Sequence, residues 1–269
     1  MSNVTRPGGR AFDQIRKFRI KPDFLAHPLA SVLAEAGGTR VICSVTFEPG
    51  VPSWMRQQNV PGGWVTSEYG MIPPATHSRT QREASKGKQS GRTMEIQRLI
   101  GRSFRSVIDL NLLGPNTVYI DCDVIDADGG TRCASICGAS AALQIAFRRL
   151  VEKKVLPRNP MRENVAAVSV GVKNGACLLD LCYEEDSAAD VDFNVVMTES
   201  GKFVELQGTA EEHPFSREKL SEILSLAELG LKQIFEVQRR VVGEVFPAAK
   251  PNPKDFGSLA DALANASPL

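Results

Sequence analysis

Apolar and polar positions alternate along the first third of the chain in the manner of extended strands. Three runs rich in apolar and β-branched residues predict strands that follow one another as an antiparallel meander: 31–34, 40–47 and 63–71. From 93 to 109 the spacing of apolar residues changes to every three or four positions, which is the spacing of a helix. Gly114-Pro115, shortly after this segment, is a stop signal for a helix. A helix is predicted over 93–109.

The second half continues with strands, a helix and two hairpins. A strand predicted over 117–125 leads through a polar, glycine-containing loop into a helix rich in small residues over 132–153. Asn174-Gly175 and Ser200-Gly201 are typical hairpin turns. The strands predicted on either side of these turns are 165–172 with 177–183, and 190–198 with 202–207.

A long helix is predicted to begin after Ser216, whose hydroxyl suits an N-cap, and to pack an apolar stripe on a sheet. Each half then has about four strands and a closing helix, which indicates a duplicated α+β fold, although the halves show no convincing sequence repeat. We predict one domain over 1–246 and a flexible C-terminal tail over 247–269, which is rich in Pro and Ala.

Composition excludes several classes of protein. The 269 residues carry 32 Lys and Arg against 31 Asp and Glu, a formal net charge of +1, so the totals indicate neither a polycation nor an acidic tail. No apolar stretch approaches the 18 residues of a membrane span, so we expect a soluble protein with no membrane partner. The six cysteines form no Cys-x-x-Cys pair and lie in apolar runs, which is typical of reduced core thiols in the cytoplasm.

The net charge hides a separation of charge along the chain. The segment 79–105 holds eight basic and two acidic residues, a charge of +6, which leaves −5 for the rest. Gly87 and Gly91 interrupt the basic residues just before the predicted helix, so backbone N–H groups and Arg92 can meet at one anion. A solvated helix face after a flexible loop is the alternative interpretation.

The segment 128–132 places a second arginine at a predicted helix start. Gly130 and its neighbour permit a backbone concavity, and Thr131 with Arg132 opens the helix, so the segment suits a phosphate. A plain glycine turn with a surface arginine explains it equally well. A Walker A loop is excluded at 87–93, because three rather than four residues separate the glycines and an arginine precedes the threonine.

Five acidic residues and no basic one lie within 184–192. In an extended strand Asp190, Asp192 and Asn194 share one face, and an amphipathic strand with a wet face would show the same pattern. Carboxylates two positions apart repel each other, so with Asp186 nearby they suit Mg²⁺ or Mn²⁺ held through oxygen and water. None of the three histidines has metal-ligand spacing to another.

Four segments in this order closely resemble the bacterial ribonuclease PH family: 85–109, 119–139, 178–198 and 201–212. The resemblance extends from about Arg6 to Val245. It implies the ribonuclease PH-type α+β fold of the ribosomal protein S5 domain 2-like class, assembled as a ring-shaped homohexamer, a trimer of dimers. It also implies a phosphorolytic 3′→5′ exoribonuclease that trims tRNA precursors, with inorganic phosphate as co-substrate and nucleoside 5′-diphosphates as products.

The resemblance implies roles for individual residues. The positions that match the family's phosphate-binding residues are Arg92, Gly130, Thr131 and Arg132. Asp186 and Asp192 match residues that hold Mg²⁺ or Mn²⁺ and take part in catalysis, and Arg92 is also expected to be catalytic. Arg79 and Arg82 match residues that contact RNA. Pro74 stands where the family usually has an arginine, and it is given no role.

The implied chemistry agrees with the residues present. Phosphate is already an anionic nucleophile, so positioning and charge neutralisation matter more than a strong base. We expect Arg92 and Arg132 to hold the attacking phosphate, and one of the carboxyl groups of Asp186 and Asp192, when protonated, to serve the leaving 3′-oxygen. Two other hypotheses stay open: a hydrolytic metal nuclease, and a catalytically silent ring subunit of an exosome-type complex.

Overall fold

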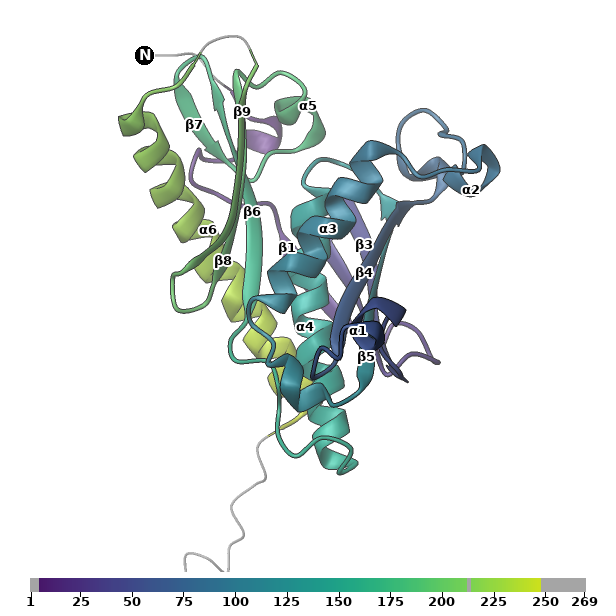
Figure 1. Ribbon diagram of the computed structural model, residues 1–269. Coiled ribbons are helices and arrows are strands. Elements are labelled where there is room, and N and C mark those ends of the chain that lie inside the picture. The colour runs from purple at the N-terminus through teal and green to yellow at the C-terminus, as the bar shows by residue number, and fades with distance from the viewer. Residues whose placement is uncertain (1–4, 212–213, 248–269) are drawn as a thin grey trace, which may run out of the picture.

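The computed structural model describes residues 5–211 and 214–247 (Figure 1). The strands are β1 (Phe18–Pro22), β2 (Ala30–Ala36), β3 (Thr39–Pro49), β4 (Trp64–Met71), β5 (Asn116–Asp126), β6 (Val165–Lys173), β7 (Ala176–Leu179), β8 (Val191–Thr198) and β9 (Phe203–Ala210). The α-helices are α1 (Ser53–Gln57), α2 (Glu83–Lys86), α3 (Gly91–Arg105), α4 (Thr131–Glu152), α5 (Tyr183–Asp186) and α6 (Arg217–Val245). Short 3-10 turns are η1 (Pro7–Gly9), η2 (Pro73–Ala75) and η3 (Leu110–Leu113).

The first sheet has the strand order β1-β2-β3-β5-β4. Strands β1 to β3 pair antiparallel, as predicted for β2 and β3, but β4 runs parallel to β5, with Trp64 opposite Thr117. The predicted meander is therefore wrong for β4. The reason is that α3 lies between β4 and β5 in the chain, and a strand–helix–strand crossover returns the second strand in the same direction.

The second sheet has the order β7-β6-β8-β9, and every neighbouring pair is antiparallel, so both predicted hairpins are confirmed. The strand predicted over 177–183 ends early, at Leu179, and Tyr183 begins α5 instead. The chain turns at Asp180, which adopts a φ of 55° while its carboxylate accepts a hydrogen bond of 2.7 Å from the backbone N–H of Arg16.

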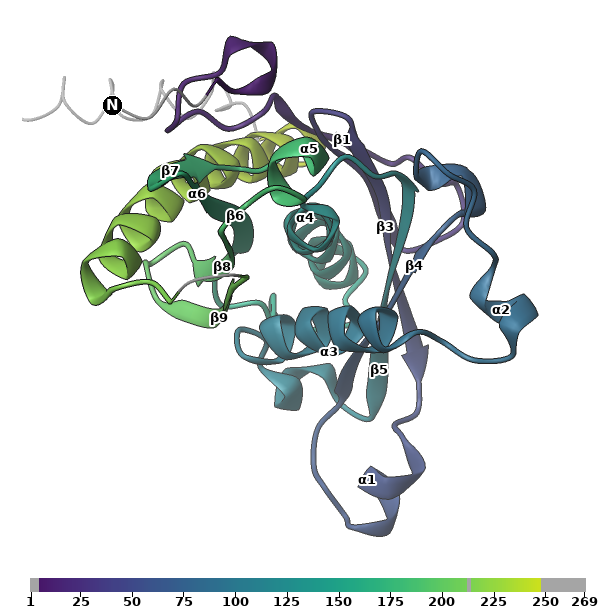
Figure 2. The same cartoon turned by 90° about the horizontal axis from the view of Figure 1, so that it is seen from above.

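Helix α4 lies between the two sheets, where Figure 2 shows it almost end-on. It is buried around most of its circumference, so its first half is built of small and apolar side chains. A Cβ atom on Gly138 would lie 2.7 Å from Cys43 Sγ, which shows how closely α4 approaches the first sheet. The core is therefore continuous from one sheet through α4 to the other.

Helix α6 covers the other face of the second sheet (Figure 1), so β8 is enclosed on both sides. The alternative of a wet strand face at 190–194 is therefore wrong. Asn194 is only 7% exposed, and its Oδ1 accepts a hydrogen bond of 3.2 Å from Cys133 Sγ on α4. Asp192 shares this covered face with Asn194 and points toward α4 rather than into bulk water.

Several further expectations can be compared with the structure. The Ser216 N-cap is confirmed, since its hydroxyl accepts the backbone N–H of Lys219 at 3.2 Å. All six cysteines are unpaired and buried, as predicted. In the two described ranges, no helix combines the length and apolarity needed to cross a bilayer. The predicted tail lies, from residue 248 onward, outside the described residues.

Candidate active site

The fold brings four of the predicted site residues together although they span a hundred positions of sequence. Arg92 is the second residue of α3, Arg132 the second of α4, Asp186 the last of α5, and Asp192 the second of β8. Burial raises the pKa of Asp186, while the positive charges of Arg92 and Arg132 partly oppose that rise. Both guanidinium groups therefore lie within electrostatic reach of the acidic residues.

The basic loop before α3 is folded by its own polar side chains. The Ser90 hydroxyl caps α3 by accepting the backbone N–H of Thr93 at 3.1 Å. Glu83 on α2 accepts the Thr93 hydroxyl at 2.7 Å and the Ser90 backbone N–H at 3.1 Å. These bonds fix the start of α3, so exposed Arg92 projects from an ordered helix N-terminus.

The glycine loop before α4 has the conformation that its sequence suggests. Gly129 and Gly130 have φ values of 72° and 65°, and a Cβ on Gly129 would lie 2.7 Å from the backbone of 181–182. Only glycine fits this approach without strain. At the start of α4, the hydroxyls of Thr131 and buried Tyr69 lie 2.8 Å apart, so Tyr69 is a site residue that sequence reasoning missed.

Arg132 is held by two side chains that sequence reasoning also missed. Its guanidinium donates a hydrogen bond of 2.7 Å to Gln207 Oε1 on β9 and lies 3.4 Å from Glu95 Oε2 on α3. Gln207 in turn donates a hydrogen bond of 2.7 Å to Glu95 Oε1. Because these contacts use one terminal nitrogen of Arg132, its other N–H groups stay available to an anion.

The two aspartates form an acidic pair in which Asp186 is exposed and Asp192 is half-buried. Burial, and then the negative charge of Asp186, raise the pKa of Asp192 to about 6. Asp192 Oδ1 is buried and has no hydrogen-bond partner among the described residues. A buried carboxylate oxygen without a partner is costly unless a ligand satisfies it, so this atom is the best fit in the site for a bound cation.

A buried arginine from the start of the chain joins the two loops of the site. Arg16 pairs with Asp180 Oδ1 at 2.7 Å, just before α5, and its guanidinium also donates to the carbonyl oxygens of Asp128 and Gly129. One side chain therefore connects the glycine loop of the first half to the acidic segment of the second. Sequence reasoning missed Arg16, because no local pattern marks a residue whose partners lie more than a hundred positions away.

The acidic segment is anchored in the same way at Glu185. Its carboxylate accepts hydrogen bonds from Arg6 at 2.7 Å and Arg10 at 2.7 Å. Burial alone would raise the pKa of Glu185, but the bonds from Arg6 and from the Cys182 backbone N–H outweigh it and lower the pKa to about 2. Glu185 is thus a structural anion that fixes α5, whereas its neighbour Asp186 faces the arginines of the site.

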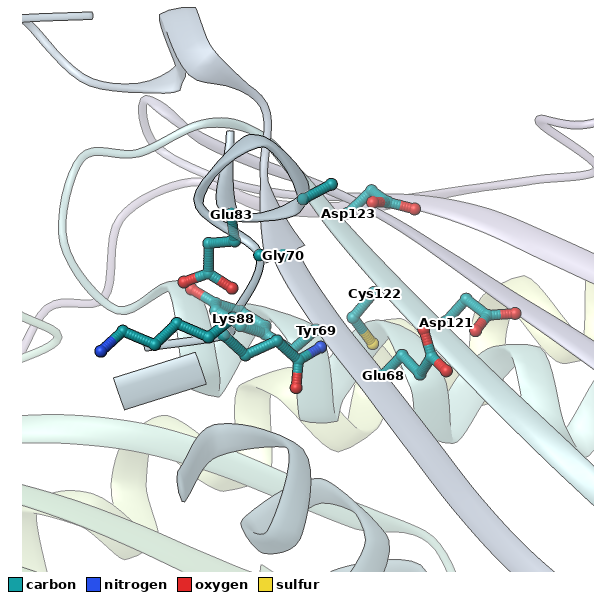
Figure 3. A pocket seen from close by; sticks show the side chains of 11 residues that line it. Glu68, Tyr69, Gly70, Glu83, Lys88, Asp121, Cys122 and Asp123 are labelled. Carbon is teal, nitrogen blue, oxygen red and sulfur yellow. The ribbon is translucent and has the colours of Figure 1, made fainter. Parts of the chain in front are cut away.

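A cavity of about 550 Å³ lies beside the basic loop, between α2 and the strand pair formed by β5 and the edge strand β4. Figure 3 shows Lys88 on one side of it and Glu68 with Asp121 on the other, where the two acids occupy opposed positions of the parallel pair. Burial, and then the charge of Glu68, raise the pKa of Asp121 and of Asp123. With Glu83, four carboxylates line the cavity and repel an anion, so this cavity is distinct from the phosphate site.

Comparison with known proteins decides the family. Models of the 3′ exoribonuclease family match residues 14–148 with domain 1 and residues 163–229 with domain 2. Ribonuclease PH of Bacillus velezensis is 54% identical over 246 residues, which cover 91% of this chain and the whole of that protein. The chain belongs to the ribonuclease PH family. As a member, it is a phosphorolytic 3′→5′ exoribonuclease of tRNA processing, and the hydrolytic and silent-subunit hypotheses are set aside.

Solved structures confirm the expected ribonuclease PH-type fold. The crystal structure of rice (Oryza sativa) Rrp46 matches with a TM-score of 0.72 and 18% identity, over 88% of this chain and 99% of that one. A chain of the Archaeoglobus fulgidus exosome with RNA bound to the active site matches with a TM-score of 0.73 and 22% identity, over 86% and 92%. At these identities the likeness concerns the fold alone.

Two of the ribonuclease PH positions lie apart from the four-residue cluster. Arg79 and Arg82 are exposed in the loop between η2 and α2, and neither is among the charges that shift the pKa of Asp186. Within residues 5–211 and 214–247 neither forms an ion pair. Pro74 lies exposed in η2. An RNA contact by Arg79 and Arg82 stays a prediction, as does a single domain over 1–246.

Proposed function

We propose that Arg92 and Arg132 hold inorganic phosphate in line with the 3′-terminal phosphodiester of RNA, opposite Asp186 and Asp192. The observation that carries this proposal is electrostatic: the positive charges of both arginines act on the carboxyl group of Asp186 and on that of Asp192. Gly130 and Thr131 supply the N-terminal turn of α4 beside them. A site with two cations and two acids can take an anionic nucleophile together with a cation-bound diester.

The reaction needs positioning more than proton abstraction. An oxygen of inorganic phosphate forms a bond to the phosphorus of the terminal nucleotide, and the bond from that phosphorus to the 3′-oxygen of the preceding nucleotide breaks. A nucleoside 5′-diphosphate and an RNA with a free 3′-hydroxyl result. Arg92 and Arg132 reduce the repulsion between the two anions and align them. Repulsion and misalignment form the main part of the barrier that the protein can lower. A proton from one of the two aspartates to the leaving oxygen stays a prediction.

We further propose that Asp186 and Asp192 hold Mg²⁺ or Mn²⁺. The unpartnered, buried Oδ1 of Asp192 and the hard oxygen donors of both side chains fit such an ion. Among the described residues no group of three or more His, Cys, Asp or Glu forms a metal site, so water and substrate oxygens would complete the coordination. When bound, the ion supplies charge neutralisation at the scissile phosphate.

The remaining expectations concern RNA and assembly. We propose that Arg79 and Arg82, exposed and free of ion pairs to the described residues, contact the RNA backbone, because such contacts need charge but no base recognition. We also propose that the substrate is the 3′ end of a tRNA precursor. We propose that the protein assembles as a homohexamer and is located in the cytoplasm. A sizing column coupled to light scattering tests the hexamer, since a monomer of 29.2 kDa would contradict it.

Paired variants on one helix test the phosphate site. Arg92→Ala should lower kcat/KM for phosphate about 100-fold, as removal of a preorganised charge at a reacting anion does. Arg98→Ala is the matched control, because Arg98 is also exposed on α3 and lies outside the charges that act on Asp186 and Asp192. Full phosphate-dependent turnover by Arg92→Ala, or an equal loss in both variants, would overturn the site assignment.

A further inference from the structure

Two aromatic rings from distant parts of the chain meet beside the acidic end of the site. His77 lies in the exposed loop after η2, and Tyr183 is the first residue of α5. Their ring centroids are 5.6 Å apart with planes inclined by 32°. Tyr183 nonetheless keeps 55% of its surface exposed, so the pair leaves aromatic surface open to solvent. Such surface gains free energy when another flat ring covers it.

The position of Tyr183 directs this surface toward the chemistry. Tyr183 and Asp186 stand three residues apart in α5, so their side chains lie on the same side of the helix, separated by about one helical turn along its axis. The Tyr183 backbone N–H lies 3.3 Å from Asp128 Oδ1, next to the glycine loop. A group stacked on Tyr183 is therefore adjacent to both acidic and phosphate-binding parts of the site.

The surrounding cavity, of about 320 Å³, offers stacking rather than anion binding. Its lining includes Arg10 and Arg16, but these are already paired with Glu185 and Asp180. Asp128 and Glu184 add negative charge on the same lining. The groups with free binding capacity are thus the two rings. A flat, largely uncharged ligand fits this combination better than a phosphate does.

We propose that His77 and Tyr183 form a stacking surface for a nucleobase of the RNA, one to three nucleotides from its 3′ end. This inference rests on the proposed function, which brings a 3′ end to Asp186. An enzyme that shortens RNA step by step meets every base in turn, and stacking suits that demand because each base has an aromatic face. The bases contact this surface, while the phosphates are held by the arginines.

Variants of Tyr183 combined with base-free RNA test the proposal. Tyr183→Ala should raise KM for RNA about 5- to 150-fold, the range that loss of one base–aromatic stack produces, and leave KM for phosphate unchanged. Tyr183→Phe should keep KM for RNA within about twofold, because its ring can still stack. The matched control is Trp54→Ala. Trp54 is likewise a partly exposed aromatic residue, with 40% of its surface exposed, and its ring forms a pair with that of Trp64. It lies on α1, remote from α5 (Figure 2).

RNA that lacks one base identifies the stacked position. An abasic nucleotide at one of the last three positions should weaken wild type as much as Tyr183→Ala does, and should not weaken Tyr183→Ala further. An unchanged KM in Tyr183→Ala, or equal abasic effects in both proteins at every position, would overturn the proposal. If Tyr183→Ala does not fold, as judged by thermal melting, His77→Ala replaces it.

A binding measurement keeps this inference separate from the proposed function. Without phosphate, 2-aminopurine at the stacked position should lose fluorescence on binding wild type and Tyr183→Phe, but not Tyr183→Ala. Absence of quenching with wild type contradicts the stacking surface even if phosphorolysis is intact. Quenching with wild type, together with phosphate-independent release of monophosphates, would contradict the proposed function and leave the stacking surface supported.

Discussion

Replacing Gln207 by leucine should weaken phosphate binding without removing a predicted phosphate ligand. Gln207 accepts a hydrogen bond of 2.7 Å from Arg132 and donates one of 2.7 Å to Glu95. Leucine has a similar volume but neither polar atom, so Glu95, at 3.4 Å, becomes the remaining partner of Arg132 at this end of its guanidinium. We expect the guanidinium to shift toward α3 and away from the glycine loop.

The magnitude follows from the bond that is lost. A hydrogen bond with one charged partner contributes about 1.5 to 3 kcal/mol, and the Arg132 side chain is 18% exposed, so the lower end of that range applies. About 1.5 kcal/mol corresponds to about a tenfold rise in KM for phosphate. The turnover at saturating phosphate should stay within about twofold, because the arginine is misplaced rather than removed.

Initial rates against phosphate concentration at saturating RNA measure both quantities. Gln144→Leu is the matched control, because Gln144 is a half-buried glutamine that bonds Asn159 at 2.9 Å, far along α4 from Arg132. It should leave KM for phosphate unchanged. An unchanged KM in Gln207→Leu, or a loss confined to turnover, would refute the positioning of Arg132 by Gln207.

Three further predictions concern charge and stability. Because the pKa of Asp192 is raised to about 6, the charged carboxylate opposes folding above that pH. Asp192→Asn should therefore raise the free energy of unfolding of the metal-free protein by about 1 to 2 kcal/mol at pH 8, measured in urea. The same variant should have no phosphorolytic activity. Glu185→Gln should destabilise by about 2 to 3 kcal/mol at pH 7; since the pKa of Glu185 is lowered to about 2, this difference should shrink as pH falls from 4.5 toward 2. Arg16→Lys keeps a charge for Asp180 but loses the planar fork that also reaches two carbonyls, so KM for phosphate should rise about tenfold with unchanged urea m-value.

These predictions would be contradicted by simple outcomes. An Asp192→Asn variant less stable than wild type at pH 8 would show that the buried charge does not oppose folding. A Glu185→Gln difference that stays constant down to pH 3 would exclude its ionisation as the source of stability. Unchanged phosphate kinetics in Arg16→Lys would show that the glycine loop is positioned without that side chain.

The features that sequence predicts well are local ones. The hairpin at Asn174-Gly175, the cap at Ser216 and the helix after Thr131 each depend on a few neighbouring residues, and the structure confirms all three. The basic loop and the acidic segment are likewise local charge patterns. Arg92 and Asp186 could therefore be predicted as site residues from the sequence, whereas the structure was needed to show that they lie close together.

The features that sequence reasoning missed depend on distant partners. Strand β1 was overlooked because it is short, carries charge at Arg19 and Lys21, and ends at Pro22, as edge strands do. Parallel pairing of β4 follows from the path of α3 and not from its own residues. In the sequence, Gln207 is one polar position in an alternating strand pattern. Its role in holding Arg132 follows from the structure, in which β9 lies beside the start of α4.

Transfer of labelled phosphate into products tests the central claim most directly. RNA with a 3′ extension is incubated with the protein and ³²P-labelled inorganic phosphate, and the products are separated by chromatography. We predict label in nucleoside 5′-diphosphates, and no degradation in phosphate-free buffer. Release of unlabelled nucleoside monophosphates, at a rate independent of phosphate, would contradict phosphorolysis at the site formed by Arg92, Arg132, Asp186 and Asp192.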